Sequence, residues 1–99
     1  MERNVQIAGF TTVDAHTKSV VDSVVERFVI KSKHKLGIAP ELKIVHKAIH
    51  KTPLNAVHNI KINLLVGGKV YHAESENREV LTALDDAITS VETRLAHAH

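Results

Sequence analysis

The sequence contains no cysteine, few aromatic residues and no long apolar run. Without cysteine, disulfides and thiolate zinc sites are excluded, and the redox compartment is left open. Aromatic residues make up 3% of the chain, which argues against RNA binding by base stacking. No apolar run approaches the ~20 residues of a membrane span, and the first ten residues lack a signal-peptide hydrophobic region. We therefore expect a cytoplasmic protein without membrane contact.

The length of 99 residues fits one domain, here residues 1–99, with one modest core. The formal net charge is +2 with neutral histidine, and the eight histidines add positive charge below pH ~6.5. This mildly basic balance is compatible with RNA contact.

A hairpin followed by a helix dominates the second half of the chain. Apolar residues alternate over Ile60, Ile62, Leu64 and Val66, which predicts a strand over residues 57–66. The pair Gly67-Gly68 then predicts a tight turn, because glycine accepts positive φ, and residues 70–75 return as a second strand. From residue 80 to residue 95 apolar side chains recur every three or four positions, which predicts a helix that covers the hairpin.

The first half supplies another strand pair and a second helix. Residues 5–7 predict a short strand, and residues 14–32 a valine-rich amphipathic helix that ends by Gly37. Three residues are candidates for its N-cap: Thr11, Thr12 and Asp14. Residues 41–50 predict a strand, and Pro53 and Asn55 a loop.

The order β-α-β-β-β-α predicts an α+β fold of two layers, with both helices on one face of a four-stranded mixed sheet. The register of residues 41–50 stays open, because both alternating sets contain apolar residues. If Leu42, Ile44, Ile60 and Ile62 point inward, His46 also faces the helices. The open face then carries Lys43, Lys47, Lys61 and Asn63.

No motif of an enzyme stands out, and we predict no catalytic residue, cofactor or metal. His46 and His50 share a strand face but lie ~13 Å apart along it, too far to bind one ion unaided. His58 and His72 could join through cross-strand pairing, although surface imidazoles with one half-buried histidine are the expected arrangement. Asp85 and Asp86 are adjacent on a helix, point in different directions, and are expected to be solvated.

Lysine and arginine provide the stronger functional signal, because they neutralise phosphates and release counterions. The predicted RNA-binding residues are Arg27, Lys31, Lys33, Lys35, Lys43, Lys47, Lys51, Lys61, Lys69 and Arg94. An ordinary solubilising surface remains the alternative. The second helix is mainly acidic, so an RNA-binding surface would avoid it or use only its C-terminal end.

An ordered set of residues resembles the ribosome hibernation promoting factors, the family that includes the ribosome-associated translation inhibitor. The set comprises the opening VQIAGF, Gly67-Gly68, His72-Ala73, Glu76, Glu79-Val80 and Ala83-Leu84-Asp85. The resemblance covers roughly Asn4 to Leu95 and the element order agrees, as for a divergent short form. It implies a double-stranded-RNA-binding-domain-like fold that binds rRNA in the small-subunit cleft and blocks translation sterically, without chemistry.

The chain departs from the family pattern where basic residues are usual. Its first helix has Thr17, Ser23 and Glu26 there, and its second helix has Ser90 and Thr93. An alternative therefore stays open, in which the fold serves as a protein-interaction module without RNA binding. A homodimer through an exposed edge of the first or fourth strand is one form of it. A small enzyme or metal sensor that uses histidine is a third hypothesis.

Overall fold

The computed structural model describes residues 5–10, 13–38, 40–52 and 55–97, and for residues 50–52, 55 and 97 it describes the backbone alone. The chain runs through β1 (Val5–Ala8), α1 (Ala15–Leu36), β2 (Glu41–Thr52), β3 (Asn55–Val66), β4 (Lys69–Asn77) and α2 (Val80–His97). This is the predicted element order.

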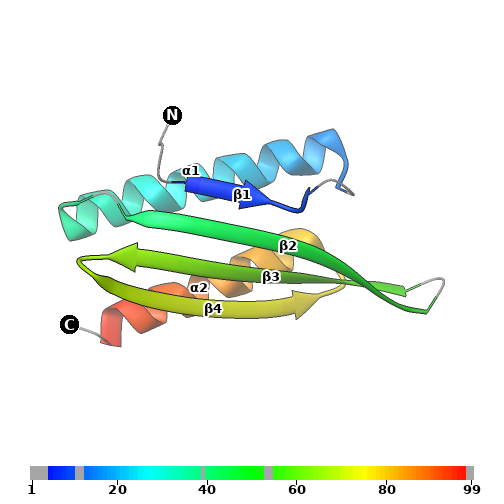
Figure 1. The fold of residues 1–99 in the computed structure, drawn as a ribbon. Helices are drawn as coiled ribbons and strands as arrows, with labels where there is room; N and C mark the ends of the chain where they lie inside the picture. The colour runs from blue at the N-terminus through cyan, green and yellow to red at the C-terminus, as the bar shows by residue number, and fades with distance from the viewer. Residues whose placement is uncertain (1–4, 11–12, 39, 53–54, 98–99) are drawn as a thin grey trace.

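The four strands form one mixed sheet in the order β1-β2-β3-β4. β1 runs parallel to β2, with Val5 beside Leu42, and the other neighbours are antiparallel. Both helices lie on the same side of the sheet (Figure 1). The α+β fold class is confirmed, and the molecule is flat and long, with extents of 45 × 27 × 17 Å.

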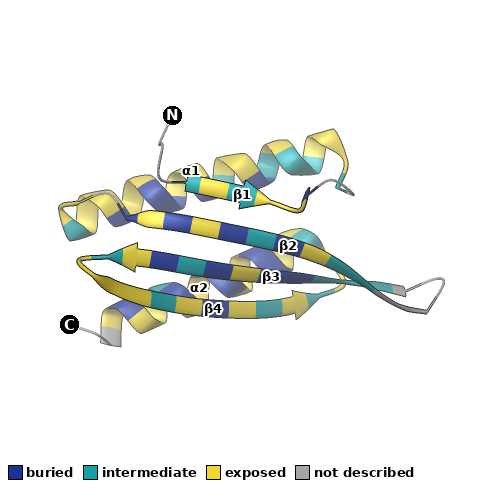
Figure 2. Cartoon of the chain, in the orientation of Figure 1, coloured by how far each residue is buried: buried dark blue, intermediate teal, exposed yellow. Residues whose placement is uncertain are grey.

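Burial resolves the register of β2. The even-numbered side chains of β2 and β3 are shielded beneath the helices, whereas their odd-numbered neighbours are mostly exposed or half-buried, as the alternating colours of Figure 2 show. The shielded strand residues are Leu42, Ile44, His46, Ile60, Ile62 and Leu64. Lys43, Lys47 and Lys61 therefore occupy the open face, as the inward-facing alternative predicted.

Two neighbouring glycines close the hairpin between β3 and β4. Val66 pairs with Lys69, so the loop consists of Gly67 and Gly68 alone. Their φ values are +59° and +79°, and positive φ at both central positions matches the right-handed twist of the flanking strands. The predicted tight turn is confirmed.

The hairpin between β2 and β3 is longer than predicted. β2 continues to Thr52, which pairs with Asn55, and the register shifts between His50 and Thr52. The prediction that Asn55 belongs to a loop is therefore wrong, because this residue opens β3. Pro53 lies outside the described residues.

Asp14 is the N-cap of α1, and its carboxylate Oδ2 accepts a hydrogen bond of 3.3 Å from the backbone N–H of Thr17. The other two N-cap candidates, Thr11 and Thr12, lie outside the described residues. Hydrogen bonding from Thr17 lowers the pKa of Asp14 below its ordinary 3.8. Because the folded state favours the charged form, this contribution to stability is complete above the ordinary pKa and is lost as pH falls through the lowered one.

α1 runs about one turn beyond the predicted end at Ser32. It stops at Leu36, and the N–H of Gly37 donates to the Lys33 carbonyl at 2.9 Å. Val21, Val25, Phe28 and Val29 are buried against the sheet, so packing holds this valine-rich helix in place.

Leu84 of α2 tests the assignment of the core, because its side chain is completely buried whereas Leu81 on the same helix is 37% exposed. We expect Leu84→Ala to lower the free energy of unfolding by ~2–5 kcal/mol, through lost burial and a residual cavity. Leu81→Ala is the matched control and should cost much less. Equal losses for the two variants in urea melts would contradict this packing.

Candidate nucleic-acid interface

The topology brings the C-terminal ends of both helices to one end of the molecule. α1 ends just before β2 begins, and Glu41 at the start of β2 pairs with Leu65 near the end of β3. The start of β4 adjoins that end of β3 through the turn, and the last turns of α2 share a groove with the last turns of α1 (Figure 1).

Six predicted RNA-binding residues gather there, and we call them the basic end. They are Lys31, Lys33, Lys35, Lys43, Lys69 and Arg94, and all six are exposed. Part of this cluster also serves stability, because Lys33, His34 and Lys35 occupy the last turn of α1, where cations oppose the helix dipole.

The other four predicted residues lie elsewhere. Arg27 is exposed on α1, one turn before Lys31. Lys47 and Lys61 lie on the open face of the sheet, further along the strands. Lys51 falls in β2, but its side chain is outside the described part. The ten residues thus do not form a single surface.

Carboxylates surround Lys47 and Lys61. Lys61 pairs across the sheet with Glu74, and Lys47 shares a row with Asn59 and Glu76. The amide of Asn59 donates to Glu74 Oε2 at 2.7 Å, which keeps that carboxylate on the open face. Phosphate contact at these two lysines is therefore opposed by neighbouring negative charge.

Acidic residues collect toward the other end of the long axis. Asp14 caps the start of α1, Glu74 and Glu76 lie in the second half of β4, and Glu79 immediately precedes α2. At the basic end the described acidic residues are Glu41 and Glu92, and Glu92 Oε2 lies 3.2 Å from Lys31 Nζ. The charge of the molecule is thus separated along its length.

His46 is a polar hub that the sequence left undefined. It is 3% exposed, and its Nδ1–H donates to the carbonyl of Gly9 at 2.9 Å. In neutral His46 the other nitrogen, Nε2, therefore accepts from His58 Nδ1 at 2.8 Å. The Phe10 ring stacks on His46 with centroids 4.7 Å apart. These contacts fasten the connection between β1 and α1 to the sheet.

Gly9 is required for this fastening. Its φ is +88°, and an added Cβ would lie 2.0 Å from the backbone oxygen of His46. The VQIAGF segment therefore ends in glycine for a steric reason.

The histidines do not assemble further within the described residues. His58 meets His46, but His72 lies on the opposite face, where its ring contacts the amide of Asn63. No group of three or more histidine, cysteine, aspartate or glutamate side chains converges there as metal ligands would. Asp85 and Asp86 are both exposed on α2.

Comparison with known protein-family models found no match to this chain, and neither did comparison with curated proteins. In the part of the chain that the structure describes, neither helix has the length and apolar character needed to cross a membrane.

His46→Leu tests the hub, because leucine fills similar space but leaves the Gly9 carbonyl without its donor. We expect unfolding free energy to fall by about 1–3 kcal/mol, the cost of an unsatisfied buried group. His72→Leu, at an exposed position, should change it by less than about 0.5 kcal/mol. Denaturant melts of the two variants make the comparison, and an unchanged midpoint for His46→Leu would contradict the assigned role.

Proposed function

We propose that this chain binds structured RNA through its basic end, and that its target is the rRNA of the small ribosomal subunit. In this proposal it occupies the cleft that tRNA and mRNA use, and blocks translation in the cytoplasm by steric exclusion, without chemistry. The separation of charge along the molecule is the observation that carries the proposal.

Electrostatics favour a polyanion at this end. Among the described residues, Lys31 is the one cation of the basic end that forms an ion pair. The remaining lysines and Arg94 are exposed and available to phosphates, which they bind with release of counterions. The acidic far end would orient the molecule, because it is repelled by the same phosphates.

The aromatic residues favour backbone contact over base recognition. Phe10 and Phe28 are buried in the core, and Tyr71 is half-buried on the helix-covered face. The described surface therefore offers no exposed ring for unpaired bases, whereas phosphates of a folded RNA need only cations.

The fold agrees with the one implied by the resemblance to hibernation promoting factors: β-α-β-β-β-α with both helices on one face. This agreement supports a family-like function. The basic end supplies cations from α1, two strands and the last turns of α2, in place of the residues the family usually uses.

Two matched double variants test the proposal. Lys33→Glu with Lys35→Glu reverses two unpaired cations of the basic end, and should weaken co-sedimentation with small subunits about tenfold or more at 100 mM salt. Lys47→Glu with Lys61→Glu changes the net charge equally and should have a much smaller effect. Thermal melts would verify folding, since the first pair also opposes the α1 dipole.

Equal losses for the two double variants would mean that net charge alone governs association. No association of the wild-type chain at ~50 mM salt, where counterion-driven binding is strongest, would refute the proposal.

The outer edge of β4 favours a second candidate, a homodimer. β4 is a terminal strand of the sheet and is nine residues long. In antiparallel pairing of two copies centred on Ala73, His72 would face Glu74 of the second copy, and Lys69 would face Asn77. No like charges meet, so the edge is self-complementary.

Sedimentation velocity over a wide concentration range tests this pairing. A dimer formed through β4 should be weakened by His72→Glu, which places two carboxylates opposite each other, and little changed by Lys18→Glu on α1. A monomer at every concentration would exclude the dimer.

A further inference from the structure

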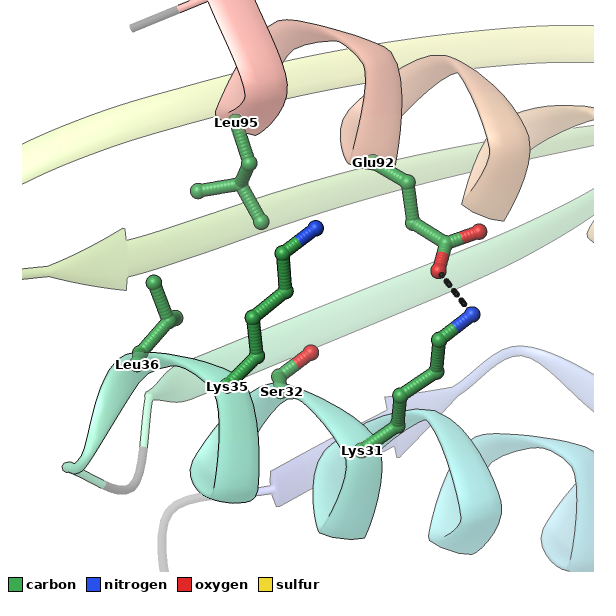
Figure 3. A pocket seen from close by; sticks show the side chains of 6 residues that line it. All are labelled: Lys31, Ser32, Lys35, Leu36, Glu92 and Leu95. Carbon is green, nitrogen blue, oxygen red and sulfur yellow. Dashed lines mark ion pairs between the residues drawn. The ribbon is translucent and has the colours of Figure 1, made fainter. Parts of the chain in front are cut away.

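A groove separates the C-terminal halves of the two helices and has a volume of about 350 Å³. Its lining is Lys31, Ser32, Lys35 and Leu36 of α1, with Glu92 and Leu95 of α2 (Figure 3). The four α1 residues lie on one side of that helix, since they are spaced by one, four and five positions, and the two α2 residues are three apart. Both walls are therefore regular helix surface.

The groove holds two cations and one anion. Glu92 pairs with Lys31 at 3.2 Å, but the two side chains remain 37% and 70% exposed, so water screens the pair and it is weak. Lys35 extends over the same groove (Figure 3) and has no ion-pair partner among the described residues. One positive charge is left without compensation.

We propose that this groove binds one phosphate of an RNA backbone and that Glu92 is a built-in competitor which the phosphate displaces; the inference rests on the proposed function. A carboxylate tethered to α2 reaches Lys31 alone. A phosphate presents more acceptor oxygens and is free to contact both ammonium groups and the hydroxyl of Ser32, which lies between them along α1.

The uncharged part of the lining fits the same ligand. Leu36 and Leu95 line the groove beside the ammonium groups. A ribose attached to the phosphate would cover this apolar surface, whereas free inorganic phosphate would leave it exposed to water. The groove thus favours a nucleotide unit over a bare anion.

Glu92→Gln tests the competition, because it preserves the shape of the side chain and frees Lys31. RNA binding should tighten by up to about fivefold, and the slope of log K against log salt should steepen by about 0.7–0.9, the change expected for one more phosphate contact. Glu26→Gln, an exposed change of equal charge on α1 outside the groove, is the control. Lys35→Gln should weaken binding and make the slope shallower by a similar amount.

Nuclear magnetic resonance separates this inference from the proposed function. Adenosine monophosphate should shift the amide signals of Ser32, Lys35 and Glu92 in the full chain, more strongly in Glu92→Gln, and adenosine without phosphate should not.

If wild-type protein binds RNA but Glu92→Gln matches Glu26→Gln and the nucleotide leaves these amides unmoved, the groove inference is overturned and the function stands. If the chain binds no RNA, the function is refuted. In that case nucleotide-dependent shifts in the groove would still support a phosphate site, and their absence would overturn it.

Discussion

The side chains of Ile44, Ile60 and Ile62 are completely shielded from solvent between the sheet and the two helices. A shift of one residue in either strand would turn these groups to water and bring lysines into the core. This one-sided burial therefore fixes the register of β2 and β3. It also determines that both helices share a face, because the opposite face carries charged and amide side chains that no helix could bury.

The basic end follows from that arrangement. α1 connects two parallel strands and must run back against them, so it ends where β2 begins. α2 returns along β4 and ends near the same place, since β2 and β4 are both antiparallel to β3. Two helix C-termini, each with partial negative charge, thus lie together, and cations stabilise both. The lysine cluster stabilises the fold and, in the proposed function, binds RNA.

Local signals in the sequence predicted most of the fold. Alternation located the strands, Gly67-Gly68 located the hairpin turn, and Asp14 was among the N-cap candidates. The extension of β2 and β3 could not be predicted, because Pro53 and the polar residues around it are typical of a longer loop. Strand pairing over the full hairpin prevails there over local turn preference.

The candidate site was less accessible to sequence reasoning. Residue type identifies Lys35 and Lys61 equally as cations, and only the topology shows that one lies in a basic cluster and the other opposite Glu74. The pairing of Lys31 with Glu92 joins helices far apart in the sequence. The contact of His46 with His58 had a partial signal, since alternation placed His46 inward.

The salt dependence of RNA binding by the wild-type chain tests the central claim most directly. Affinity for small subunits, measured from 50 to 200 mM potassium chloride, should fall with a log–log slope of about −4 to −5, because five cations of the basic end lack an internal partner. A slope near zero, or affinity that persists unchanged at high salt, would contradict an interface built from lysine and phosphate.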